Sequence, residues 1–303
     1  MESSIPGLSL AAQPAALTMA VSFTDLVKPH LAVPPFDYSD APEFVLVSPP
    51  KLSRRLACRP GKCLHRAMPA DFWLIFIFLA VVIPWRGRVR LRHLMKVPSL
   101  GTREKLALYG VTIVSQWAAL GVVAWRAFAR GLTATQLGLA RQDSIRIIAA
   151  SVGGAVVLGS IHWFKLRQAG RVRHPSADVF RKLARVILPA NSLEFLVYVA
   201  LALTAGICEE FLYRGFAMAA LSRAGLGIWE VVILTSVLFG FAHAYQGISG
   251  IVGTSLMGFV FAGARLLLGS LAPVMAWHAA VDVVAGIAGP KYLVSTDEVK
   301  EPV

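Results

Sequence analysis

The chain has 303 residues, of which 56% are hydrophobic and 16% are charged, and its mean hydropathy is +0.63. Because soluble domains carry about 25% charged residues, this composition excludes an ordinary soluble protein. The formal net charge of +13 would suit a nucleic-acid-binding protein, but Lys and Arg crowd the short stretches between long apolar runs, as in membrane proteins, so no nucleic acid is expected as a partner.

The first 67 residues differ from the rest of the chain. They contain several prolines, lack long apolar periodicity and end in a basic stretch from Lys51 to Arg66, a composition that predicts a disordered tail. No signal peptide is expected, because no basic residues precede the mildly apolar stretch and Pro14 interrupts it. A second interpretation is that translation begins at Met68, directly before the first strongly apolar run.

Apolar runs of membrane-spanning length dominate the remainder. A helix that crosses the hydrocarbon core needs about 20 apolar residues, so we expect an all-α protein, a polytopic membrane bundle of about seven transmembrane helices. Residues 68–185 would hold the first three helices and two basic loops, residues 186–290 the last four helices, and residues 291–303 a short polar tail. The segment Gly131–Arg141 is too polar to span and should form a short connecting helix. The expected spans are residues 69–85, 105–125, 145–164, 190–212, 228–246, 248–268 and 270–289.

Basic residues in the connecting segments bear on the orientation in the membrane. Segments 86–105 and 165–185 carry seven Lys or Arg residues each and fall on one side, whereas segments 126–146 and 51–66 carry four and six and fall on the other. If translation begins at Met68, the positive-inside bias makes the first pair cytoplasmic. If the basic N-terminal stretch is folded near the membrane, the bias nearly vanishes, and the sequence leaves the choice open.

Ionisable residues interrupt the apolar runs in the final third of the chain. Such a side chain costs about 2.5–3.5 kcal/mol at the bilayer centre, so each interruption calls for an explanation. Glu210 and Arg214 are spaced i,i+4 and can pair on one helix face. Glu209 points about 100° away and is free for another partner. The alternative explanation is that a helix leaves the membrane here and ends in charges.

Two histidines form the other interruptions. A lone histidine near a span end, such as His243, is often a structural hydrogen-bonding residue, and His278 and Asp282 are i,i+4 neighbours that can satisfy each other. All these groups nevertheless fall in the final four runs, so we expect them to meet in one polar cavity. At about 1.5 Å per residue, Glu209 reaches the depth of His243 only if its helix continues to about Ser222.

The residue types suit hydrolysis. A carboxylate beside an imidazole can deprotonate a water and pass the proton to a leaving amine, and a second histidine can donate to the developing oxyanion. Alternatively, Glu209, His243, His278 and Asp282 supply nitrogen and oxygen ligands for zinc, three of which would leave a position open for water. The spacing does not separate the two mechanisms. No HExxH helix, GxSxG elbow or phosphate-binding glycine loop occurs in the sequence.

Three motifs carry a family resemblance. Glu209-Glu210-x-x-x-Arg214, Phe239-x-x-x-His243 and His278-x-x-x-Asp282 resemble the ordered motifs of the CPBP family, which includes prenyl-protein endoproteases that act on CAAX substrates and bacterial self-immunity proteins. The resemblance covers roughly residues 190–289. It implies an α-helical intramembrane endopeptidase of a bacterial-type cytoplasmic membrane, with membrane lipid and a peptide or prenylated protein substrate as partners.

The resemblance also implies roles for the site residues. Glu209 would activate water together with His243, and His278 would form the oxyanion site with the residue at position 282. Glu210 and Arg214 would hold the helix and the shape of the cavity.

Residue 282 departs from the family pattern. Asp282 stands where many relatives have Asn, and an ionised aspartate only accepts hydrogen bonds, so orienting His278 or binding a metal suits it better than an oxyanion role. Phe239 would support the site. Family members are often labelled metalloproteases, although a glutamate–histidine mechanism is also argued for them. If a metal such as zinc is used, Glu209, His243 and His278 would bind it.

Two other functions remain open from the sequence. A non-enzymatic immunity or partner-binding protein could keep the same motifs for structure. A transporter would also explain polar residues at the midplane, but no inverted repeat is visible.

Overall fold

The computed structural model describes residues 68–140, 144–171 and 175–294, with the side chains of residues 175–180 left out. The tail predicted for residues 1–67, with its alternative start, and most of the polar C-terminal tail lie outside this part of the chain. Every element in the described ranges is helical, so the predicted all-α class is confirmed.

The helices follow one another with short connections. Three of the long helices are interrupted or extended by π-helical segments, which are marked η2, η3 and η5, while η4 is a 3₁₀ turn. The elements are α1 (Ala70–Ile77), η2 (Phe78–Val82), α2 (Ile83–Leu94), α3 (Thr102–Ala129), α4 (Ala134–Leu137), α5 (Ser144–Ala169), α6 (Pro175–Ile187), α7 (Ser192–Glu210), η3 (Phe211–Ala217), α8 (Met218–Arg223), α9 (Ile228–Ala242), η4 (Ala244–Gln246), α10 (Gly247–Leu268), α11 (Ala272–Gly289) and η5 (Pro290–Val294).

Six helices in the described residues are long and apolar enough to cross a membrane. They correspond to six of the seven predicted spans, and the integral membrane character expected from the sequence is supported by them. The seventh predicted span, residues 228–246, is the exception, because α9 has only 15 residues. The short connecting helix expected at Gly131–Arg141 is present as α4.

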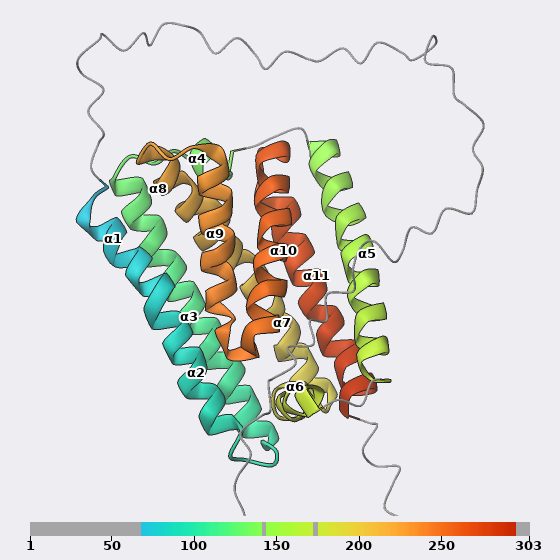
Figure 1. The fold of residues 1–303 in the computed structure, drawn as a ribbon. Coiled ribbons are helices and arrows are strands. Elements are labelled where there is room, and N and C mark those ends of the chain that lie inside the picture. Colours follow the sequence, from blue (N-terminus) through green and yellow to red (C-terminus); the bar gives the residue numbers. More distant parts are fainter. Residues whose placement is uncertain (1–67, 141–143, 172–174, 295–303) are drawn as a thin grey trace, which may run out of the picture. The chain divides into compact units, whose positions relative to one another are not determined.

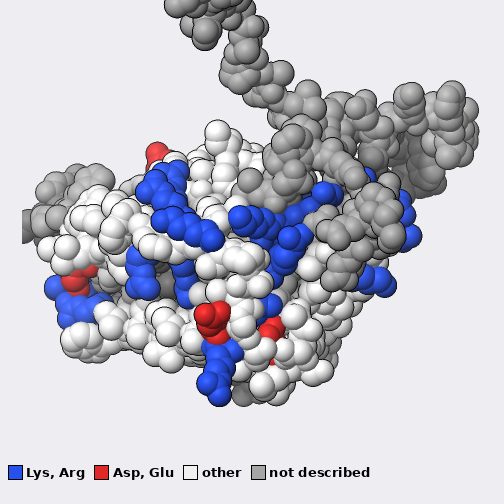
Figure 2. Space-filling model, turned by 90° about the horizontal axis from the view of Figure 1, so that it is seen from below, with Lys and Arg blue, Asp and Glu red and all other residues white. Residues whose placement is uncertain are grey.

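Long helices alternate in direction across the bundle (Figure 1). In this view α3, the α7–α8 helix and α10 run upward, while α1–α2, α5, α9 and α11 run downward and α6 lies across the lower end. The two most basic connecting segments, at 86–105 and 165–185, therefore share the lower end. Figure 2 shows Lys and Arg side chains gathered on this end, with far fewer Asp and Glu.

The α7–η3–α8 helix lies at the centre of the bundle. Half of its most apolar stretch is buried, whereas only 6% of the corresponding stretch of α5 is buried. Helix α5 packs mainly on α11 and leaves most of its surface for lipid. Every residue from Phe211 to Ala220 is buried, so this part of the helix is surrounded by protein on all sides. The central helix thus offers positions for polar side chains away from lipid.

Two local features bring the polar residues to one depth. The helix that carries Glu209 continues without a break to Arg223, as the rise argument required, and its π-helical segment starts directly after Glu210. Such π segments often occur at functional sites. Helix α9 ends early at Ala242, so His243 caps it inside the bundle and not at the lower end.

Candidate active site

Three ionisable side chains from three helices converge at the end of α7. The Glu209 Oε2 atom lies 4.0 Å from His243 Nε2 and 4.0 Å from His278 Nε2. Their side chains are 21%, 16% and 10% exposed, so the cluster is mostly shielded yet reachable. The structure therefore brings together the three residues that the sequence nominated from separate spans.

A glycine allows two of these helices to approach closely. A Cβ atom added at Gly206 would lie 2.7 Å from the Met275 carbonyl oxygen and 2.9 Å from the Ala279 nitrogen, closer than real Cβ contacts. Small residues at such positions permit close backbone packing of membrane helices. Gly206 thus sets α7 against α11 and puts Glu209 and Glu210 within reach of His278.

His278 is oriented by a buried carboxylate. Its Nδ1 atom lies 2.7 Å from Glu210 Oε1, which also accepts a hydrogen bond from Arg214 Nη1 at 3.0 Å. Both Glu210 and Arg214 are fully buried, which rules out the alternative that the helix leaves the membrane at these charges. The predicted Glu210–Arg214 pair is confirmed, and it holds the catalytic candidate His278 as well.

The contact expected between His278 and Asp282 is present as an ion pair and not as a hydrogen bond. Asp282 Oδ2 lies 3.7 Å from His278 Nε2, beyond hydrogen-bond distance, and its side chain is 34% exposed. The ring's hydrogen bond goes to Glu210 on the neighbouring helix because that carboxylate is buried and held in place. Asp282 therefore faces the Nε2 atom of His278, whereas Glu210 bonds to the Nδ1 atom.

His243 is held by its own helix. Its Nδ1 atom lies 3.0 Å from the Phe239 carbonyl oxygen, and since a carbonyl can only accept, Nδ1 carries the proton. In the neutral ring, Nε2 is then a hydrogen-bond acceptor that faces Glu209. The centroid of the Phe239 ring lies 4.7 and 5.9 Å from those of the His243 and His278 rings and 4.1 Å from Arg214 Cζ, so Phe239 packs against all three side chains.

Sequence reasoning missed one member of the cluster, Gln116. This residue lies midway along α3, and its Nε2 atom donates a hydrogen bond of 2.8 Å to Glu209 Oε1. Its own Oε1 atom is buried and has no partner. A neutral amide inside an apolar run was the available signal, but it lies far from the three motifs in the sequence.

The donor spacing was tested against a metal ion. Zinc bound at about 2.0–2.1 Å to each ligand brings tetrahedral donors to about 3.3 Å from one another, whereas Glu209 lies 4.0 Å from each histidine nitrogen. Among the residues that the structure describes, no group of three His, Cys, Asp or Glu side chains is placed to hold a metal. In this arrangement the side chains therefore do not fit a formed zinc site.

A gap of 4.0 Å suits a bridging water. Polar groups at such a distance are commonly joined by one ordered water molecule, and here one carboxylate oxygen faces two imidazole nitrogens. The cluster can therefore hold a water against a base and keep a donor beside it, which are the requirements of water-mediated acyl hydrolysis.

Comparison with protein families identifies a match within the second half of the chain. A family model described as Type II CAAX prenyl endopeptidase Rce1-like matches residues 191–284. No curated protein and no solved structure matches the chain. The matched region runs from α7 into α11 and contains all the site residues named above except Gln116. Residues 191–284 are therefore a domain of the CPBP family, the membrane core of a CAAX-protease-like intramembrane endopeptidase.

Proposed function

We propose that this protein hydrolyses a peptide bond in a membrane-associated peptide or protein, with a water molecule activated by Glu209 and His243. The observation that carries the proposal is the position of Glu209 Oε2, 4.0 Å from the Nε2 atoms of both His243 and His278. A water molecule bound to this carboxylate oxygen can face the carbonyl carbon under attack.

The first step divides the work between two residues. Glu209 accepts one proton of the water while His243 Nε2 accepts a hydrogen bond from the other, and the water oxygen attacks the carbonyl carbon. A tetrahedral oxyanion forms as the C=O π bond opens. Glu209 then returns its proton to the amine nitrogen, and the C–N bond breaks to give a carboxylic acid and an amine. The acid passes its remaining proton to the amine through Glu209, so a carboxylate and an ammonium group leave the site.

The second histidine serves the oxyanion. Glu210 accepts the Nδ1 proton of His278, so the Nε2 atom carries a proton only when the ring is an imidazolium. Arg214 already balances Glu210, which leaves Glu209 and Asp282 to balance the charge on the ring. We assign Asp282 to this charge balance, and His278 Nε2–H to the oxyanion.

The substrate class extends the family match. The matching family is described by its action on CAAX prenyl proteins, and the surrounding lipid would bring a prenylated or otherwise membrane-bound chain to the site. We place the reaction in a bacterial-type cytoplasmic membrane, in line with the bacterial members that the sequence resembles.

A cleavage panel tests the proposal. The purified full chain in nanodiscs is given prenylated and unprenylated peptides, beside Glu209→Gln and a control, Glu104→Gln, whose exposed side chain only caps α3. We expect cleavage by the wild type and by the control, and none by Glu209→Gln. Preference for the prenylated peptides would support the substrate class. A folded wild-type protein that cleaves nothing across the panel would overturn the proposal and favour an immunity or partner-binding role.

A further inference from the structure

A cavity of about 590 Å³ opens at the upper end of the bundle, between α4, α8 and α10. It lies at the opposite end from the α9–α10 connection that carries His243. Three arginines line it, Arg214, Arg223 and Arg265, and none of the described residues in its lining is Asp or Glu. The cavity therefore has a strongly positive wall.

Arg265 is a buried charge for which the described part of the chain provides no carboxylate partner. It is only 8% exposed, and its Nη2 atom donates to the carbonyl oxygens of Thr135 and Gln136 at 3.4 and 3.1 Å. Its Nε atom is buried and has no partner. Carbonyl groups hold the guanidinium in place but leave its charge uncompensated, which is costly in a low-dielectric setting.

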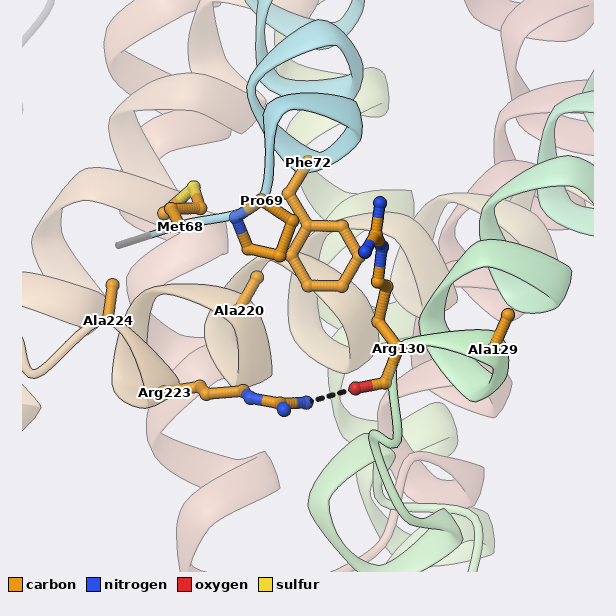
Figure 3. A pocket seen from close by; sticks show the side chains of 8 residues that line it. All are labelled: Met68, Pro69, Phe72, Ala129, Arg130, Ala220, Arg223 and Ala224. Atoms are coloured by element: carbon orange, nitrogen blue, oxygen red, sulfur yellow. Dashed lines mark hydrogen bonds between the residues drawn. The ribbon is translucent and has the colours of Figure 1, made fainter. Parts of the chain in front are cut away.

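Arg223 is partly exposed, and no carboxylate among the described residues pairs with it either. Figure 3 shows a second, smaller pocket that Arg223 also lines, where its guanidinium donates to the Arg130 carbonyl oxygen and the Arg130 guanidinium lies beside Phe72. The hydrogen bond from Arg223 measures 2.6 Å. Arg130 has its own carboxylate, since its Nε donates to Asp71 at 3.1 Å. Arg214 is balanced by Glu210. Within the cavity lining, the arginines without a carboxylate partner among the described residues are therefore Arg223 and Arg265.

We propose that this cavity binds a phosphate group. Guanidinium groups bind phosphate through paired, charge-assisted hydrogen bonds, and the hydroxyls of Thr135 and Ser222 stand in the same lining. A phosphate here would supply the missing counter-charge to both arginines. Arg223 and Arg265 have no part in the proposed peptidase reaction, so the proposal stands or falls independently of the proposed function.

Two sources of phosphate fit the place. One is the headgroup of a glycerophospholipid in the leaflet at this end, since Leu266 lines the cavity and its neighbour Leu267 is 80% exposed, an apolar surface for an acyl chain. The other is free inorganic phosphate from solution.

Native mass spectrometry of the detergent-purified full chain tests the site. The probes are phosphatidylglycerol, diacylglycerol with the same acyl chains but no phosphate, and inorganic phosphate. We expect phosphatidylglycerol to bind about tenfold more tightly than diacylglycerol, and Arg265→Gln to weaken its binding about tenfold, the usual range for one charge-assisted hydrogen bond. Arg265→Lys should lose less, because it keeps the charge.

Two further variants keep the test sharp. Arg146→Gln removes an exposed arginine at the same end but outside the cavity and should bind as the wild type does. If Arg265→Gln detaches α4 and lowers the melting temperature, Arg223→Gln replaces it as the test variant. Equal binding of diacylglycerol and phosphatidylglycerol, or unchanged binding in folded Arg265→Gln and Arg223→Gln, would overturn the proposal. Binding of inorganic phosphate with the same sensitivity to these variants, without lipid selectivity, would assign the site to the free ion.

Discussion

Two buried carboxylate clusters lie along the same central helix, and they differ in how well their polar atoms are satisfied. At the start of α7, the two oxygens of Glu194 accept four hydrogen bonds of 2.7–3.2 Å, and the side chain is 2% exposed. The donors are Thr102, Lys105, Asn191 and the backbone nitrogen of Ala190. This cluster ties α7 to α3 and has no capacity left.

At the end of α7 the carboxylates are left incomplete. Among the described residues, Glu209 accepts one hydrogen bond, from Gln116, and has two imidazole nitrogens at 4.0 Å, while Glu210 Oε2 and Gln116 Oε1 are buried without partners. Buried polar groups are normally paired, so unpaired ones call for an explanation such as catalysis or bound water. Burial of charge therefore marks both clusters, whereas spare hydrogen-bonding capacity marks only the proposed active site.

The largest expected effect falls on the incomplete cluster. Glu209→Gln keeps the shape and the contact with Gln116 but removes the base, so we expect cleavage to fall about 10²–10⁴-fold with no change in the melting temperature. Measuring the cleavage rate and the thermal unfolding of the same preparation checks both parts. A variant that melts early and cleaves normally would reverse the assignment of the two clusters.

Changes in the Glu194 cluster should lower stability and leave the cleavage rate unchanged. Glu194→Ala leaves Lys105 buried without its partner, so we expect the free energy of unfolding to fall by about 3–5 kcal/mol. The folded fraction should cleave at the wild-type rate. The double variant Lys105→Met/Glu194→Leu replaces both charges with apolar groups and should recover most of the stability. If the double variant is as unstable as the single one, burial of an unpaired charge is not the cause.

Much of this arrangement follows from the sequence, for a physical reason. Ionisable groups are costly in lipid, so Glu209, His243 and His278 stand out in otherwise apolar runs, and the run lengths predict the helices. The same reasoning overlooked Glu194 and Lys105, because charges at the ends of apolar runs look like span boundaries.

Contacts between helices were the harder part. The sequence shows His278 beside Asp282 on one helix, but the partner of His278 is Glu210, which depends on the close packing of α7 on α11 at Gly206. Gln116 is a neutral amide that carries no insertion cost comparable to a charge. Its contact with Glu209 depends on the placement of α3, which no periodicity predicts.

Gln116 joins the first half of the chain to the proposed active site, through its hydrogen bond to Glu209. We infer that it is a positioning residue, which fixes Glu209 so that Oε2 faces the histidines. Gln116→Met keeps the size but removes the hydrogen bond to a charged group, and we expect kcat to fall about 10- to 100-fold while KM stays unchanged. The neighbouring Ser115→Ala is the control, since its exposed hydroxyl bonds only within α3. A rise in KM at constant kcat would instead place Gln116 in substrate binding.

The smallest effect is expected from removing metal ions. The proposed route uses only Glu209, His243 and His278, whose atoms stand farther apart than the ligands of a zinc ion. Treatment with a chelator should therefore leave kcat/KM unchanged, and elemental analysis of the active protein should find no stoichiometric metal. Loss of cleavage with the chelator, and its recovery with added zinc, would show that the three side chains close on a metal when substrate is present. In that case the spare capacity of the cluster would belong to metal ligands and not to a bridging water, and the contrast with the saturated Glu194 cluster would still hold.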